Sequence, residues 1–310
     1  SMRRLILQDY NLLEIVDLRG AKIFSTATVT NCIPIVRKGK ELGCEKTSDS
    51  KAGTVGIAHI DAEQNIKVAF EKPITELVID EKTGVWNLAE QALNNSRHKD
   101  LHVLGDFCYI CMGACVSAHE KYAKGQFKKA DLISDTCDEK HPRKYIEGKD
   151  ISRYSINRIR YIEYETKRSP SKWSRPKFSD FFSQPKLFVN VLGSLMATVD
   201  ISNSFIHSDT ILGIVLWKDL EDVENKSITG SITRYSRYSR QKMEELSEQV
   251  NLYYLLAILN STYASHLLDI QRGGDYHIYP EHIRNLPIPI AHKQEMDALT
   301  SLAKEQLAQH

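Results

Sequence analysis

Apolar side chains follow a helical period between residues 251 and 290, which read NLYYLLAILNSTYASHLLDIQRGGDYHIYPEHIRNLPIPI. Intervals of three and four are typical of a helix that buries one stripe, and this helix would include Asn260 and Ser261. We expect Gly273-Gly274 to end it. Leu286 to Pro289 should be extended, because proline fixes φ, lacks an N–H and pushes the preceding residue towards β. The stripe consists of Leu252, Leu255, Leu256, Leu259, Tyr263 and Leu267.

β-branched residues predict strands in the N-terminal part of the chain. Residues 12–18 and 28–37 form two such runs, and residues 56–60 and 66–70 form a hairpin with residues 61–65 as its turn. So few helices lie between these strands that they cannot complete a doubly wound domain. This part is therefore expected to be the end of one.

The remainder of the chain is expected to mix helices and strands. Residues 196–200 and 211–217 are predicted central strands, and residues 295–309 a terminal helix. A short helix over residues 86–95 and the polar run 94–100 come before them. We therefore divide the chain into two domains, residues 1–98 and residues 99–310.

Composition indicates an ordinary soluble protein. The chain has 310 residues, of which 42% are hydrophobic and 26% charged, enough for two domains with their own cores. No apolar run is long enough to cross a bilayer and no signal-peptide core is present, so we expect a cytoplasmic protein without a membrane partner. Six unevenly spaced cysteines favour reduced thiols over a disulfide scaffold.

Basic residues gather in two segments, although the formal net charge is only +1. Residues 231–242 interleave arginine with tyrosine and serine, which suits guanine edges and phosphate oxygens. As a helix, this run would place Arg234, Arg237 and Tyr238 on one face and Arg240 off it; as a loop, all of them could enter a major groove. A solvated surface loop is the alternative. The other segment contains Lys140, Arg143, Lys144, Lys149, Arg153, Arg158, Arg160, Lys167, Arg168, Lys172, Arg175 and Lys177.

Several short motifs resemble one family in their order along the chain. They are "LLAILNS", the Gly-Gly turn and "LPIPI" near the C-terminus, and four earlier elements: the expected opening strand and turn at residues 104–113, a "G-x-D-I-x-R-Y" element at residues 145–154, the following strand at residues 161–164 and a "PK" strand within residues 173–190. The chain resembles the C-terminal target-recognition region, of the TaqI-like specificity type, of adenine-specific DNA methyltransferases and type IIG restriction-modification enzymes. A more distant likeness is to type I specificity subunits.

The resemblance implies an α+β fold. Residues 1–98 would be the C-terminal remnant strands of a methyltransferase α/β sheet, and residues 99–310 a mixed α+β target-recognition domain with terminal helices. Its partner would be double-stranded DNA, read by sequence. In the family, an aromatic residue in the loop after the "IVDL" strand packs against the flipped adenine; Phe24 matches it, and a core aromatic is the alternative.

The motifs that carry the family's chemistry are missing. The sequence has no G-x-G turn after a first strand, and no Asn/Asp-Pro-Pro-aromatic motif. We therefore expect no methylation by this chain alone and no cofactor in it. S-adenosylmethionine would be bound by the parent enzyme, through a missing N-terminal catalytic domain in the same polypeptide or a partner subunit.

Charge and resemblance together select the candidate DNA contacts. They are Arg153, Arg158, Arg175, Lys177, Arg234, Tyr235, Arg237, Tyr238 and Arg240. A type I-like recognition module is the first alternative, but the sequence shows no long helical spacer. A metal-dependent nuclease using Asp150, Glu165 and Lys167 is the second. A zinc site would draw on Cys108, Cys111, Cys115 and Cys137 with His119 or His141, but no second compact pair accompanies the Cys-x2-Cys pair, so no metal site is predicted.

Overall fold

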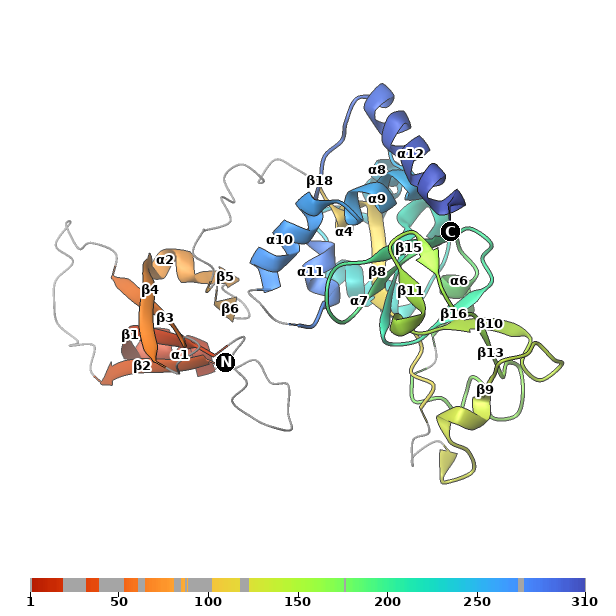
Figure 1. Cartoon of the computed structure of the whole chain (residues 1–310), viewed down its shortest axis with the longest axis horizontal. Coiled ribbons are helices and arrows are strands. Elements are labelled where there is room, and N and C mark those ends of the chain that lie inside the picture. Colours follow the sequence, from red (N-terminus) through yellow and green to blue (C-terminus); the bar gives the residue numbers. More distant parts are fainter. Residues whose placement is uncertain are drawn as a thin grey trace. The chain divides into compact units, whose positions relative to one another are not determined.

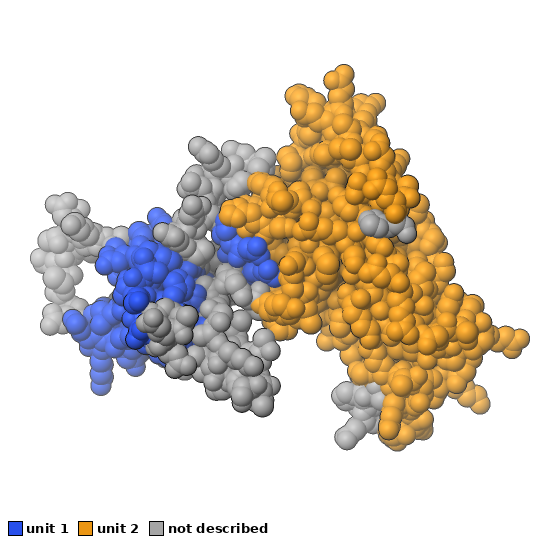
Figure 2. Space-filling view, viewed as in Figure 1, with its two compact units in different colours: residues 1–97, 269–275 blue, residues 98–268, 276–310 orange. Residues whose placement is uncertain are grey.

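The computed structural model describes residues 2–18, 32–38, 53–60, 65–80, 85–86, 88, 102–117, 123–175, 177–272 and 276–309. It divides into two compact units, shown in two colours in Figure 2. Unit 1 comprises residues 1–97 and 269–275, and unit 2 residues 98–268 and 276–310. Among the described residues, no helix has both the length and the apolar character needed to cross a membrane.

Unit 1 contains a four-stranded mixed sheet in the order β2-β1-β3-β4. Strand β1 (Tyr10–Asp17) is antiparallel to β2 (Cys32–Lys38) and parallel to β3 (Thr54–Ile60), and β3 forms a hairpin with β4 (Ile66–Pro73). The predicted first strand and the hairpin are confirmed. The second strand is confirmed from Cys32 onward, and residues 28–31 lie outside the described part.

One face of this sheet forms the core of unit 1. The remaining elements of the unit are α1 (Met2–Asp9), α2 (Ile74–Leu77), β5 (Val78–Asp80) and β6 (Val85–Trp86). Because Trp86 is buried in a strand that pairs with β5, the predicted helix does not begin there; residues 89–95 lie outside the described part. The buried cluster consists of Leu12, Ile15, Val55, Ile57, Leu77, Trp86 and Leu88.

Unit 2 is built on an antiparallel sheet in the order β15-β14-β17-β8. The strands are β8 (Cys108–Met112), β14 (Lys186–Asn190), β15 (Ala197–Asp200) and β17 (Ile211–Leu216), and nearly all their side chains are buried. The predicted "PK" strand and the two central strands are confirmed. The opening strand starts later than expected, because residues 104–107 form a helical turn, α4 (Leu104–Phe107).

A second sheet of unit 2 has the order β16-β10-β13-β9 and packs on an aromatic core that includes Tyr145, Trp173 and Phe181. Its strands are β9 (Ile133–Ser134), β10 (Arg143–Ile146), β13 (Arg160–Ile162) and β16 (Phe205–His207). Unit 2 also contains short elements between and after these strands: η1 (Lys129–Leu132), η2 (Gly148–Asp150), β11 (Ile151–Ser152), β12 (Ser155–Ile156), α6 (Ser179–Phe182) and η3 (Trp217–Leu220).

The C-terminal part of unit 2 is helical. It contains α7 (Lys226–Tyr235), α8 (Arg240–Ser247), α9 (Leu252–Leu259), α11 (Pro280–Arg284), α12 (Lys293–Ala308) and α10 (Thr262–Arg272) as far as Leu268, the later residues of α10 being grouped with unit 1. Helix α12 packs against α9 (Figure 1). The "LPIPI" segment is extended as predicted, since β18 (Pro287–Ile288) pairs with β7 (His102–Val103).

The single helix predicted after residue 251 is wrong, because the chain forms two helices that meet at Asn260. The side chain of Asn260 accepts a hydrogen bond from the N–H of Ala197 and donates one to its carbonyl, each at 2.9 Å. Tyr263 is 45% exposed and therefore does not belong to the buried stripe. With its helices and sheets both substantial, the chain has an α+β fold.

Candidate nucleic-acid interface

Helix α7 presents one buried and one exposed face. Asn225 begins it by accepting a hydrogen bond from the N–H of Ser227 at 2.9 Å. Ile228 is buried and Ile232 is half-buried against the aromatic core. The spacing of four between these isoleucines fixes which side of the helix faces inward. Lys226, Ser227, Thr229, Thr233 and Arg234 are exposed.

The exposed face of α7 lines an open depression of about 740 Å³. No residue of α7 is acidic, so the helix contributes two cations and several hydroxyl groups to this surface. The depression is lined by Glu224, Asn225, Lys226, Thr229, Gly230, Thr233 and Arg234. We call this surface the α7 face.

The hydroxyl and guanidinium groups on the α7 face also contact their own helix. Thr233 donates a hydrogen bond to the carbonyl of Thr229 at 2.9 Å, and Arg234 Nε donates to the carbonyl of Gly230 at 2.9 Å. A side chain at Gly230 would place its Cβ 3.1 Å from Nη2 of Arg234. Glycine at this position therefore lets Arg234 lie back along the helix.

The predicted basic run 231–242 is a helix end, a short linker and a helix start. Residues 236–239, which we call the linker, join α7 to α8. Arg237 lies in the linker and forms an ion pair with Asp106, and its Cζ lies 5.5 Å from the centre of the Tyr238 ring. The carboxylate of Asp106 raises the pKa of Arg237. Tyr238 is half-buried and packs against the aromatic core, so it supports the linker.

Tyr235 contacts the protein on two sides. The guanidinium of Arg284 lies 4.1 Å from the centre of its ring, and its hydroxyl donates to Glu281 at 3.2 Å. Burial lowers the pKa of Arg284, whose Nη2 donates to the carbonyl of Ile110 at 3.2 Å. These contacts fix the end of α7 against α11. Tyr235 nevertheless remains 42% exposed.

The side chain of Arg240 is only partly exposed and makes contacts within unit 2. Its guanidinium donates to the carbonyls of Leu220 and Val223, and its Nε donates to Glu244 at 2.8 Å. The carbonyl of Leu220, the last residue of η3, also accepts the N–H of Val223 at 3.0 Å, and the cation adds a second donor there. These contacts hold the Arg240 side chain against the protein, and its role in DNA contact stays a prediction.

Much of the first basic segment is also paired inside unit 2. Arg160 is buried and forms ion pairs with Glu147 and Asp150. Burial alone would raise the pKa of Glu147, but hydrogen bonds and charge from Lys129 and Arg160 bring it to about 2. The network joins η2 to β13 and therefore holds the "G-x-D-I-x-R-Y" element in place.

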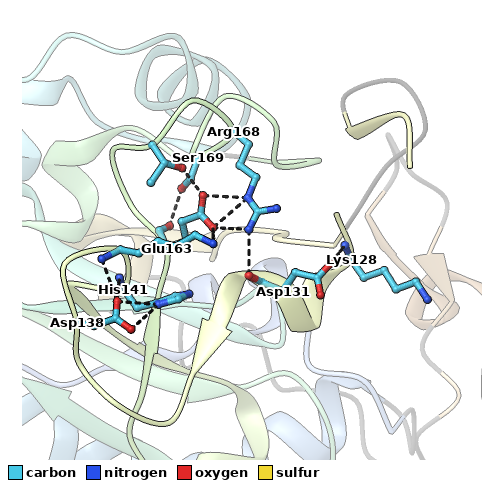
Figure 3. Close-up of polar contacts among 9 residues, drawn as sticks. Lys128, Asp131, Asp138, His141, Glu163, Arg168 and Ser169 are labelled. Carbon is cyan, nitrogen blue, oxygen red and sulfur yellow. Dashed lines mark hydrogen bonds and ion pairs between the residues drawn. The ribbon is translucent and has the colours of Figure 1, made fainter. Parts of the chain in front are cut away.

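Figure 3 shows a second such network around Glu163. Both carboxylate oxygens of Glu163 accept hydrogen bonds from Arg168, at distances between 2.7 and 3.0 Å. Arg168 also donates to the carbonyl of Asp131 at 3.2 Å, and Ser169 donates to the carbonyl of Glu163 at 2.6 Å. Lys140 lies 3.4 Å from Glu163. Arg168 and Lys140 are thereby turned towards the protein.

The other predicted contacts of this segment reach solvent. Arg153 is exposed, and its Nη2 lies 3.5 Å from the hydroxyl of Ser265. Arg158 is exposed and pairs with the equally exposed Asp135 at 2.8 Å. Arg175 is exposed and Lys177 is half-buried. Among the described residues, the hydrogen bonds and ion pairs of Arg153 and Arg158 do not reach the α7 face.

The residues of the nuclease alternative do not form a metal site. Asp150 is buried, accepts the N–H of Glu147 at 2.8 Å and pairs with Arg160, whereas Glu165 and Lys167 are exposed. Within the described residues, no three His, Cys, Asp or Glu side chains are grouped so that they could hold a metal. Cys108 and Cys111 are buried in β8, Cys137 is exposed, and Phe24 and His119 lie outside the described part.

Two features were missed from the sequence. The exposed threonines of α7 are not among the predicted contacts, although Ile228 and Ile232 are spaced as one helix face and would have indicated which side is exposed. Asp106 went unnoticed because its partner Arg237 lies 131 residues away. No local pattern carries that information.

Comparison with solved structures gives weak likenesses, and one of them is to a restriction enzyme. No family model and no curated protein matches the chain. Among solved structures, the type IIG restriction endonuclease BpuSI matches with a TM-score of 0.36 and 12% sequence identity, over 98% of this chain and 40% of that chain. The chain thus spans less than half the length of that enzyme. At this level the likeness carries no functional argument.

Proposed function

We propose that unit 2 recognises a sequence in double-stranded DNA, as the specificity part of an adenine-N6 DNA methyltransferase or a fused restriction-modification enzyme. The α7 face carries this proposal. It combines cations with hydroxyl groups on an exposed helix that has no acidic residue. The order of motifs along the sequence supplies the adenine-methyltransferase context.

The dimensions of α7 suit the major groove. A helix of 10 residues is about 15 Å long, and the groove, about 12 Å wide, admits a single helix. Threonine hydroxyls can donate to or accept from base edges, and arginine can pair with guanine O6 and N7. Thr229, Thr233 and Arg234 are therefore the proposed base-reading side chains, and Lys226 is a proposed phosphate contact.

Unit 1 would belong with a catalytic part that lies elsewhere. Its sheet exposes apolar side chains, including Ile33 and Val68 at 50% and 54% exposure. Sheets with parallel pairs, such as β1 with β3, are commonly covered on both faces. We propose that the catalytic domain supplies this cover and binds S-adenosylmethionine. The present residues do not fit that cofactor, since the sequence has no G-x-G turn, and no chemical step is assigned to them.

Fluorescence anisotropy with the full chain tests the proposal. Labelled duplexes enriched from a randomised library should bind more tightly than unselected duplexes, and affinity should fall as salt rises. Replacing Thr229, Thr233 or Arg234 with Ala should cost roughly 1 to 3 kcal/mol on a selected duplex and little on unselected duplexes. Lys226→Ala should weaken both equally.

Lys242→Ala is the matched control. Lys242 is an exposed cation on α8 that pairs with Glu245 at 3.1 Å, and its loss should leave DNA binding almost unchanged. The proposal is wrong if selection enriches no sequence, or if the α7 variants bind the selected duplex as the wild type does.

A further inference from the structure

Asp106 is a buried carboxylate held at the start of α4. Its side chain is only 4% exposed, and its Oδ2 accepts the N–H of Val103 at 2.8 Å. His102 Nδ1 lies 3.6 Å from the same oxygen. A carboxylate so deeply buried requires a cation or several donors near it. Arg237, which lies 131 residues later in the sequence, supplies the cation.

Arg237 combines an anchored end with an exposed side chain. The side chain is 44% exposed although its partner is nearly inaccessible. The linker that carries it is fixed locally: the N–H of Tyr238 donates to Ser236 Oγ at 3.1 Å, and Ser236 Oγ donates to the carbonyl of Tyr238 at 2.6 Å. The Tyr238 ring lies 5.8 Å from His102. Both the backbone and the guanidinium of Arg237 are therefore positioned before any ligand binds.

A fixed guanidinium matters more for one kind of contact than for another. A phosphate accepts an arginine from many directions, so prior orientation contributes little there. A guanine presents O6 and N7 in one plane and needs a guanidinium aligned with that plane. An exposed arginine would otherwise lose its rotamer freedom on binding, and a preformed ion pair reduces that loss.

We propose that Asp106 is a positioning residue that orients Arg237 to read a guanine of the bound duplex. The inference rests on the proposed function of unit 2. It assigns sequence discrimination to the linker as well as to the α7 face. It also assigns Asp106 a function in DNA recognition, although an exposed carboxylate at this place would repel DNA.

Asp106→Asn tests the inference in the full chain. Asparagine keeps the shape of the side chain and an oxygen for the N–H of Val103, and removes the charge that fixes Arg237. On a selected duplex the affinity should fall about 2- to 12-fold, the range expected when one long side chain must be ordered on binding. Affinity for unselected duplexes should not change. Combined with Arg237→Ala, the Asp106→Asn change should have no further effect on discrimination.

Chemical substitution in the DNA gives a second measurement. Its result should not change if Asp106 and Arg237 only stabilise the fold. Replacing each guanine of the selected duplex in turn by 7-deazaguanine removes N7. One position should weaken binding of the wild type and leave Arg237→Lys unaffected. Arg237→Lys retains a cation for Asp106 but lacks the rigid planar fork with which a guanidinium matches guanine O6 and N7 at once, so this comparison stands even if Asp106→Asn fails to fold.

Glu248→Gln is the control for loss of a carboxylate, since Glu248 pairs with Lys218 at 3.1 Å at an exposed site. The inference is overturned by an equal loss on selected and unselected duplexes, by a gain in affinity, or by a loss that persists in the Arg237→Ala background. It is also overturned if no 7-deazaguanine position separates wild type from Arg237→Lys. If the wild type prefers no duplex, the proposed function fails with it; if the preference exists without this coupling, only the role of Asp106 fails.

Discussion

Asn260 should be one of the most sensitive polar positions in unit 2. Its side-chain amide pairs with both backbone groups of Ala197, on the outer edge of β15. Asn260 is only 7% exposed and Ala197 is fully buried, so water cannot replace the amide. The break between α9 and α10 exists because this bond takes the place of a continuing helix.

The cost of Asn260→Ala follows from the groups that it leaves behind. The N–H of Ala197 would have no partner, at a cost of roughly 1 to 3 kcal/mol. The carbonyl of Ala197 would lose one bond, worth about 0.5 to 1.5 kcal/mol, but would keep the N–H of Tyr154 at 2.9 Å. The free energy of unfolding of unit 2 should therefore fall by roughly 2 to 4 kcal/mol.

Urea unfolding followed by tryptophan fluorescence measures this change. Trp173 and Trp217 report on unit 2, and Trp86→Phe removes the signal of unit 1, so that one cooperative transition can be fitted. Asn251→Ala, which removes the cap at the other end of α9, is the control and should cost about 1 kcal/mol. A loss at Asn260 no greater than the loss at Asn251 would refute the assignment of the helix break to the Ala197 bonds.

Two further predictions concern charge and close approach. Burial raises the pKa of Glu163, but Arg168, Thr166 and Lys140 outweigh it and bring the pKa from the usual 4.5 to about 2, so its stabilising contribution is complete above about pH 4.5 and is lost as the pH falls towards 2. Glu163→Gln should flatten the loss of stability over that interval in urea titrations at several pH values, and an unchanged acid profile would contradict it. Gly113→Ala would place a Cβ 2.2 Å from the backbone carbonyl oxygen of His207 and should destabilise unit 2 by roughly 1 to 3 kcal/mol, whereas Gly230→Ala meets only the end of Arg234 and should stabilise α7 by up to about 1 kcal/mol. Equal melting temperatures for the two glycine variants would contradict this prediction, because they would show that the backbone moves away from the added Cβ at residue 113 at no cost in stability.

Local pattern was enough for most strands. The runs at residues 12–18 and 211–216 alternate or accumulate apolar residues as buried strands do, the strand at residues 186–190 followed from the resemblance, and proline indicated the extended conformation of "LPIPI". The helix break at Asn260 could not be predicted in the same way. An asparagine inside a helical period has no local reason to end the helix, and the reason here is a strand edge 63 residues earlier.

The candidate interface was predictable in its location but not in its residues. The sequence drew attention to residues 231–242, and the exposed α7 face and the linker lie there or directly before it. Whether an arginine is available to DNA, however, depends on the carboxylates and carbonyls that the fold brings to it. Arg240 meets two carbonyls at the end of η3, while Arg237 meets Asp106 and remains partly exposed.

The same reasoning limits what a count of basic residues says about DNA affinity. Glu147 contacts Lys129, Lys149 and Arg160, and Glu163 contacts Lys140 and Arg168, so each acid holds several cations at once. Those cations still contribute to the electrostatic field around the protein, but the ion pairs with Glu147 and Glu163 determine where their charged groups lie. Counterion release counts only the phosphates that are neutralised by contact. The slope of log affinity against log salt concentration should therefore reflect only the few exposed cations of one face. A slope large enough to count every basic residue in the sequence would require the networks around Glu147 and Glu163 to open when DNA binds.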